Sequence, residues 1–451
     1  MDDSTKVIAK LPNPNAGLSH LTTASEAATR EFVSHTSTTV SKALTAPGKP
    51  LGSLWHQMPK KSRLETVSQI VEFESRLSSP TFESHGCIYF RETIPDQPNT
   101  SKPLITNPPI SSTASEHFTL GPLTTAELWD CTHADFTVDR GPWDTLLEYV
   151  EAMGRNELEW VKRCSKPRKV SYRATEDPEL PEEVISLINA YLRIAPSLVA
   201  PVKVEDIHSP NLWHPDLHRD NVFVDPHTNK ITGIIDWQSA AVTPLFLQCG
   251  VPRMFRHSKS VEQNWAVPEK PSDYEDLSPE EQARVDADIE GITYHKYYKY
   301  QSLKKSPRHW ACLEQQDAIE LRTAPIRLVT NCCWRNSDVF WFREALMAVV
   351  KRWNDLDDSG SPCPIHFSEE VYRLHALEDA NMSAVGEILK IFRDECVLPV
   401  DGMVNPVYFQ RVKKDNMKFK DTFVGLASTP EEKKLHERIW PYQDSDSWES
   451  T

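Results

Sequence analysis

Residues 214–237 constrain the fold of this chain more than any other segment. Two runs of β-forming residues, Val222–Val224 and 231–235, are separated by six residues rich in turn formers. This pattern predicts a β-hairpin. Because a tight hairpin returns the chain to its starting point, we expect Asn221, just before the first run, to lie beside Asp236, just after the second.

The polar residues at this hairpin are those that phosphoryl transfer requires. Such a site needs a carboxylate that accepts the proton of the attacking hydroxyl, and oxygen ligands that hold magnesium against the phosphates. His214, Asp216 and Asn221 follow the spacing H-x-D-x-x-x-x-N. We therefore interpret Asp216 as the catalytic base, and Asn221 and Asp236 as magnesium ligands. Each residue alone is common, but the combination with two β runs and a terminal Asp-Trp is rare.

These residues resemble the aminoglycoside phosphotransferase and choline-kinase-like superfamily, whose members are relatives of protein kinases. The resemblance is to its fungal branch related to altered inheritance of mitochondria protein 9. It extends over residues 7–34, 51–90, 118–165 and 205–245 and the C-terminal helical region. It implies a kinase that transfers the γ-phosphoryl group of ATP to a hydroxyl of a small molecule, with ATP and Mg²⁺ as cofactors and with the roles given above for the base and the metal ligands.

The resemblance also implies two residues that serve the nucleotide. Lys10, at the end of the short β run 7–9, matches the lysine that contacts the α- and β-phosphates. Glu26, sixteen residues later in a predicted helix, matches the ion-pair partner of that lysine. The alternative is a strand-end lysine and an exposed helix carboxylate with no shared role.

The fold class expected from this resemblance is α+β: a protein-kinase-like two-lobed fold with a reduced N-terminal β lobe and a large, mainly helical C-terminal lobe. Only nine residues, none of them Gly, precede Lys10, whereas the phosphate-covering loop and its two strands take on the order of 20–30 residues. Residues 35–61 contain three prolines and no paired β runs. We therefore expect weak or undetectable ATP binding. A non-catalytic, pseudokinase-like binding or scaffolding protein is the alternative function.

The chain divides into five segments in this interpretation. They are an incomplete N-lobe (1–60), a helical part of the C-lobe with a flexible insertion near 91–115 (61–200), the catalytic loop and metal-binding hairpin (201–250), a C-terminal helical region (251–440) and a polar tail (441–451).

Several helices are indicated by apolar spacing and by their first residues. Residues 142–161 and 181–194 each have Pro near the first turn, a common position for it. Ser62 and Glu65 form the pattern of a capping box, which predicts that a helix starts at Ser62.

Composition limits the partners of the chain. Its 65 acidic residues against 50 Lys and Arg give a net charge of −15, which disfavours nucleic acids and anionic membranes as partners. Nine cysteines without a C-x-x-C pair indicate reduced intracellular thiols. The resemblance implies mitochondria, but the N-terminus carries no presequence, so the cytoplasm is the alternative location.

Other readings of the catalytic loop remain open. His214 is expected to orient the backbone near Asp236 rather than to act as an acid or base. Together with Asp216 and His218, it also fits a metal hydrolase, although no further ligands with familiar spacing are present. His218 is expected to line the acceptor pocket.

The charge around the loop indicates which charge the acceptor substrate should carry. Two acidic residues near it, Asp220 and Asp225, favour a cationic substrate.

Overall fold

The structure is a computed structural model of the 451-residue chain. It describes residues 18–36, 46–94, 100–109, 112–129, 138–199, 207–257, 261–357, 359–394, 408–440 and 442. Lys10, the β run at 7–9 and most of the polar tail therefore lie outside the described residues.

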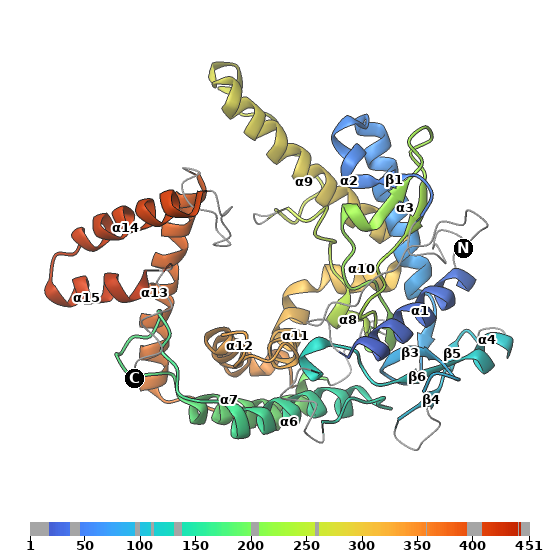
Figure 1. Ribbon diagram of the computed structural model, residues 1–451, viewed down its shortest axis with the longest axis horizontal. Helices are drawn as coiled ribbons and strands as arrows, with labels where there is room; N and C mark the ends of the chain where they lie inside the picture. Colours follow the sequence, from blue (N-terminus) through green and yellow to red (C-terminus); the bar gives the residue numbers. More distant parts are fainter. Residues whose placement is uncertain are drawn as a thin grey trace.

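The described chain is a mixture of helices and small β-sheets in which helices dominate, as predicted (Figure 1). The main helices are α1 (Ser19–Thr36), α2 (Leu51–Leu54), α3 (Lys60–Ser78), α4 (Ser112–His117), α6 (Leu146–Cys164), α7 (Pro181–Leu198), α8 (Leu245–Gln248), α9 (Pro279–Lys305), α10 (Pro307–Glu314), α11 (Gln316–Thr330), α12 (Val339–Lys351), α13 (Glu369–Asp394), α14 (Phe409–Gly425) and α15 (Pro430–Ile439). The strands are β1 (Lys49–Pro50), β2 (Thr81–Phe82), β3 (Cys87–Phe90), β4 (Lys102–Pro103), β5 (Thr106–Asn107), β6 (Phe118–Gly121), β7 (Pro210–Leu212), β8 (Val222–Val224), β9 (Ile231–Ile234) and β10 (Val242–Pro244). None of these helices combines the length and the apolar character needed to span a lipid bilayer.

The predicted hairpin is confirmed. Strands β8 and β9 pair antiparallel, with Val222 opposite Ile234, and the short strand β1 adds to the other edge of β8. Asn229 occupies the turn with a φ of 57°, in the left-handed region that Asn tolerates better than most residues. The residues that flank the hairpin are thereby held on a three-stranded sheet.

The region 81–121 contains strands that the sequence analysis missed. Strands β3, β6 and β4 form an antiparallel sheet in that order, and β2 pairs with β5. Helix α1 packs against β3, with Phe32 centred 5.6 Å from Phe118 and 5.9 Å from Phe82. The expected flexible insertion near 91–115 thus contributes strands β4 and β5 in its described part, because pairing with β6 and β2 stabilises runs of only two residues.

Helices α6 and α7 pack against each other and lie side by side in Figure 1. Helix α6 starts four residues later than predicted, after a capping box formed by Thr145 and Glu148. The delay has a tertiary cause, because Trp143 exchanges two backbone hydrogen bonds with His85. Helix α7 begins at Pro181 as predicted.

The predicted capping box at Ser62 is wrong. Helix α3 starts two residues earlier, after Pro59, and has no side-chain cap. Ser62 lies within the first turn, where its hydroxyl accepts a hydrogen bond from Asn229 in the hairpin turn at 3.3 Å. The side chain therefore joins the helix to the hairpin instead of capping the helix.

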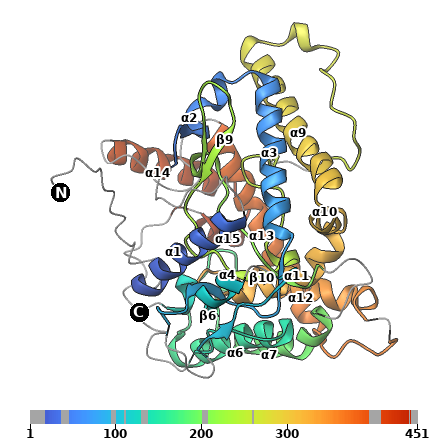
Figure 2. The ribbon, with the colours of Figure 1, turned by 90° about the vertical axis from the view of Figure 1, so that its right-hand side faces the viewer.

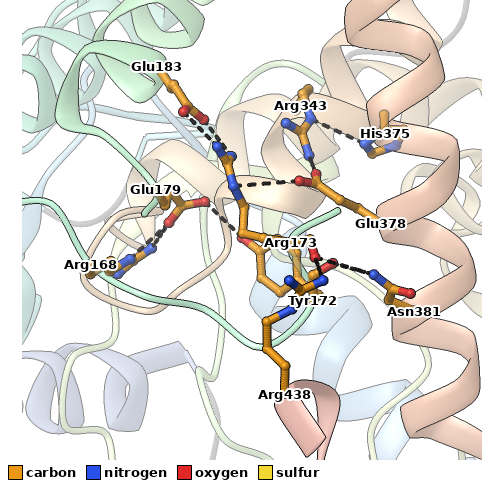
Figure 3. Close-up of polar contacts among 10 residues, drawn as sticks. All are labelled: Arg168, Tyr172, Arg173, Glu179, Glu183, Arg343, His375, Glu378, Asn381 and Arg438. Atoms are coloured by element: carbon orange, nitrogen blue, oxygen red, sulfur yellow. Dashed lines mark hydrogen bonds and ion pairs between the residues drawn. The ribbon is translucent and has the colours of Figure 1, made fainter. Parts of the chain in front are cut away.

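Helix α13 is joined to the segment before α7 by a network of buried charges (Figure 3). Glu378 is 2% exposed and pairs with Arg343 of α12 and with Arg173, whose Nε lies 3.7 Å from its Oε1. Asn381, one turn later, donates to the carbonyl of Tyr172 at 3.0 Å. These contacts bring together residues about 200 positions apart.

A second buried carboxylate joins α3 to α9, which run side by side in Figure 2. Glu74 is 1% exposed and accepts a hydrogen bond from the Tyr298 hydroxyl at 2.5 Å. Burial raises the pKa of Glu74 to about 8, although the hydrogen bond from Tyr298 opposes this rise. The carboxyl is therefore largely protonated at neutral pH.

This raised pKa predicts a pH-dependent stability. Because the folded pKa lies above the unfolded value of 4.5, the free energy of unfolding should fall as the pH rises from about 4.5 through about 8. Glu74→Gln cannot ionise, so its stability relative to the parent should increase over that window, by up to about 4 kcal/mol. Urea unfolding between pH 5 and pH 9 measures this difference. The exposed Glu72→Gln on the same helix is the control, and parallel pH profiles for parent and Glu74→Gln would contradict the prediction.

Candidate active site

The catalytic loop and the hairpin form one hydrogen-bonded unit. The backbone N–H of Ile235 donates to the carbonyl of Asn221 at 3.0 Å, which continues the pairing of β8 and β9 by one step. Asp236 follows immediately. The hairpin thus places the two predicted magnesium ligands, Asn221 and Asp236, at the same end of the sheet, as the sequence pattern indicated.

His214 has the structural role predicted for it. Its Nε2 lies 2.9 Å from the carbonyl of Ile235, and its Nδ1 accepts from the backbone N–H of Asp216 at 3.2 Å. These partners fit a neutral ring that carries its proton on Nε2. Burial lowers the pKa of His214 to about 4, against the opposing effects of the Ile235 carbonyl, Asp236 and Asp216. The hydrogen bonds of the ring therefore connect the catalytic loop to the end of β9.

The same contacts argue against the metal hydrolase reading. Both ring nitrogens of His214 are hydrogen-bonded to the backbone, so neither is available as a metal ligand. Across the described parts of the chain, no group of three or more His, Cys, Asp or Glu side chains is arranged to hold a metal.

Asn221 is oriented by the loop that carries the predicted base. Its side chain is 6% exposed, and its Nδ2 donates to the carbonyl of Asp216 at 2.9 Å. With the amide nitrogen used in this way, Oδ1 is the atom left to bind a cation. The 3-10 turn that ends at Asn221 begins after His218, whose Nδ1 accepts from the N–H of Asp220 at 3.3 Å.

Asp236 has an unusual backbone conformation. Its φ is 64°, in the left-handed region that costs an L-residue about 1–2 kcal/mol, and such conformations cluster at functional sites. The next residue, Trp237, is fully buried and centres its ring 4.7 Å from His214 and 6.0 Å from Phe73. Packing of this tryptophan holds the strained carboxylate position in place.

Asp216 is the accessible member of the three predicted residues. Its side chain is 71% exposed, and its carboxylate lies 3.6 Å from Nε2 of His218. Both residues line a cleft of about 1100 Å³ between the catalytic loop, residues 253–257 and α9. Asn221 and Asp236 do not line it. His218 therefore lies in a cleft beside the predicted base.

The sequence analysis missed three arginines that line the cleft. Arg253 and Arg256 come from the loop after the hairpin, and Arg284 comes from α9. They belong to no sequence motif that would predict their role. They follow the catalytic loop by 30 residues or more and lie beside it only in the folded chain.

The segment around β1 is held against the catalytic loop. Arg219 stacks over the ring of Trp55 at 4.6 Å and donates to the carbonyl of Met254 at 3.1 Å. Gly52 lies so close to the loop that a Cβ there would come within 2.3 Å of Oδ1 of Asp220. The atom that it would meet is the end of an exposed side chain, which can move, so the contact shows that α2 lies close to the loop.

Of the two predicted nucleotide residues, the structure describes only Glu26. Lys10 lies outside the described residues. Glu26 is 7% exposed on α1, so the alternative of an exposed helix carboxylate is wrong. Helix α1 packs mainly against β3 and α3. The structure thus brings Asp216, Asn221 and Asp236 into one unit and places Glu26 on a different element.

Comparison with known proteins agrees with this geometry. Residues 141–247 match the phosphotransferase enzyme family. The match begins just before α6 and ends in α8, so it includes Asp216, Asn221 and Asp236. It confirms the resemblance inferred from the sequence.

Curated relatives extend the similarity beyond that segment. A subtelomeric hrmA-associated cluster protein of Aspergillus fumigatus is 26% identical over 98% of this chain and 93% of its own length, and its counterpart in a second strain matches equally. Altered inheritance of mitochondria protein 9, mitochondrial, of Yarrowia lipolytica is 20% identical over 75% of this chain and 57% of its own length. The named fungal branch is therefore among the relatives, as the resemblance implied.

Proposed function

We propose that this protein is a phosphotransferase of the aminoglycoside phosphotransferase type, which transfers the γ-phosphoryl group of ATP to a hydroxyl of a small molecule. The observation that carries the proposal is the joining of the loop to the hairpin by His214 and by the Asn221–Ile235 hydrogen bond. The family match over the same residues supports it.

The roles follow from the chemistry of each side chain. Asp216, exposed in the cleft, would accept the proton of the acceptor hydroxyl, while the hydroxyl oxygen bonds to the γ-phosphorus and the bond from that phosphorus to ADP breaks. Asn221 and Asp236 supply the oxygen donors that Mg²⁺ prefers. The metal, when bound, would neutralise charge on the phosphates.

The finer architecture is also part of the proposal. We infer a two-lobed arrangement in which α1 and the strands near it form a reduced N-terminal lobe over a mainly helical C-terminal lobe, with Lys10 and Glu26 paired at the nucleotide. In the described residues between 46 and 61, β1 is the only strand. That observation favours the alternative of a pseudokinase-like binding protein. We also propose a mitochondrial location, with the cytoplasm as the alternative, because several relatives are named as mitochondrial proteins.

Nucleotide binding separates the two functions. A reduced lobe offers few contacts to offset the entropy lost on binding, so we expect weak binding, with a dissociation constant of Mg-ATP above about 100 μM, roughly −5.5 kcal/mol. Isothermal titration calorimetry of the full chain with Mg-ATP measures this value. Micromolar affinity would contradict the reduced lobe. No binding at millimolar Mg-ATP, together with no transfer to any hydroxyl compound, would favour the pseudokinase alternative.

A further inference from the structure

The cleft beside Asp216 has a basic wall that the proposed reaction does not use. Arg253 and Arg256 lie on one segment and Arg284 on α9, and all three are exposed. Arg256 is anchored by a hydrogen bond from its Nε to the carbonyl of Val251 at 3.1 Å. Within the described chain, none of the three arginines takes part in an ion pair. Apart from Nε of Arg256, their guanidinium donors are therefore available to a ligand.

The carboxylates of the cleft, by contrast, have basic neighbours. His218 lies 3.6 Å from Asp216 and 3.9 Å from Asp220. Asp288 is 3.0 Å from Nε2 of His257. The lining as a whole contains four arginines and three aspartates, in a chain whose net charge is −15. The cleft thus gathers arginines in an acidic protein, and a cluster of positive charge attracts ligands of the opposite sign.

The acidic residues that favoured a cationic substrate are only partly in this cleft. Asp225 lies in the hairpin turn, where its Oδ1 accepts from the backbone N–H groups of His227 and Thr228 at 2.9 and 2.8 Å. Its carboxylate therefore has a turn-forming role. Asp220 lines the cleft, next to His218.

We propose that the wall of Arg253, Arg256 and Arg284 binds an anionic group of the acceptor, so that the acceptor is a small alcohol that carries a phosphate or a carboxylate. This inference rests on the proposed function for the role of Asp216, which faces the same cleft. Guanidinium groups match both anions because their paired N–H donors fit two oxygens at once. The anion at the wall would leave the hydroxyl end of the molecule toward Asp216.

Binding in the absence of ATP tests the wall independently of catalysis. Calorimetric titrations of the full chain would use glycerol 3-phosphate and glycerate as anionic alcohols, with glycerol and choline as neutral and cationic comparisons. We expect both anions, or the one whose geometry fits, to bind and the other two compounds to show no binding. Arg253→Glu and Arg284→Glu should each weaken anion binding about tenfold or more.

The matched control is Arg155→Glu, which makes the same charge change at an exposed site on α6 outside the cleft. It should leave anion binding unchanged, and circular dichroism checks the fold of all three variants. The inference is overturned if choline or glycerol binds while neither anion does, if the cleft variants bind like the control, or if they weaken only Mg-ATP binding.

The two proposals fail in different ways. If anions bind in a way that depends on the arginines but no phosphoryl transfer occurs, the anion-binding proposal is supported and the proposed function is contradicted. If phosphoryl groups are transferred to choline but to neither anionic alcohol, the proposed function is supported and the arginines are not the acceptor site.

Discussion

Replacement of Asp216 by Asn should reduce phosphoryl transfer by about a hundredfold to ten-thousandfold while the fold remains intact. General-base catalysis contributes about 10²–10⁴ to such rates, and Asn cannot accept the proton of the hydroxyl. Because the Asp216 side chain is 71% exposed, its loss as a charge should leave the stability within about 0.5 kcal/mol of the parent. Initial rates of ADP release with an active acceptor measure the first effect, and urea unfolding measures the second.

The matched control is Asp220→Asn, in the same loop and equally exposed at 72%. It removes the same charge from the cleft, but Asp220 is not the residue assigned as proton acceptor. The rate of phosphoryl transfer should therefore stay within a few-fold of the parent. Asp216→Asn with parent-like turnover would remove the assignment of the base. Equal losses in both variants would show that cleft charge, and not a proton acceptor, controls the rate.

Replacement of Glu378 by Gln should destabilise the protein, or the docking of α13, by about 3–5 kcal/mol. Removal of one partner from a buried ion pair leaves the other charge uncompensated. Here the variant would leave Arg343 with His375 as its remaining partner, at 3.1 Å from Nε to Nδ1. Arg173 would keep Glu183, which accepts hydrogen bonds at 2.7 and 2.9 Å. Urea unfolding measures the global loss, and hydrogen exchange of α13 measures local opening.

Glu387→Gln provides the control on the same helix. Its side chain is 74% exposed and lies 3.8 Å from Lys390, a surface pair of the kind that contributes little. We expect its unfolding and exchange to match the parent. If Glu378→Gln behaves like Glu387→Gln, the network of Figure 3 does not hold α13 against the rest of the chain.

The core of the candidate site follows a local sequence pattern, and for that reason it was predictable. Two β runs and the turn between them lie within 14 residues, and the hairpin alone brings Asn221 next to Ile235 and Asp236. The structural role of His214 was predictable from its place in the same motif. The contacts that define this unit are close in sequence, so the pattern and the folded geometry agree.

Other elements depended on partners far along the chain. Strands β3 and β6 stand 28 residues apart and β3 carries no alternation of polar and apolar residues, since it is nearly all buried. The start of α6 was displaced by the pairing of Trp143 with His85. Ser62 was predicted as a cap, but the helix begins earlier, at Lys60, directly after Pro59. The Ser62 hydroxyl instead accepts a hydrogen bond from Asn229 in the hairpin turn.

The sequence by itself determined the loop and hairpin that present Asp216, Asn221 and Asp236, because short-range spacing and turn chemistry are sufficient to predict them. Only the tertiary structure decided that Arg253 and Arg284 line the cleft beside that loop and that Glu26 is buried on α1. The physical reason is that burial and charge pairing depend on which distant segments pack together. The local spacing of apolar and polar residues carries no information about such contacts.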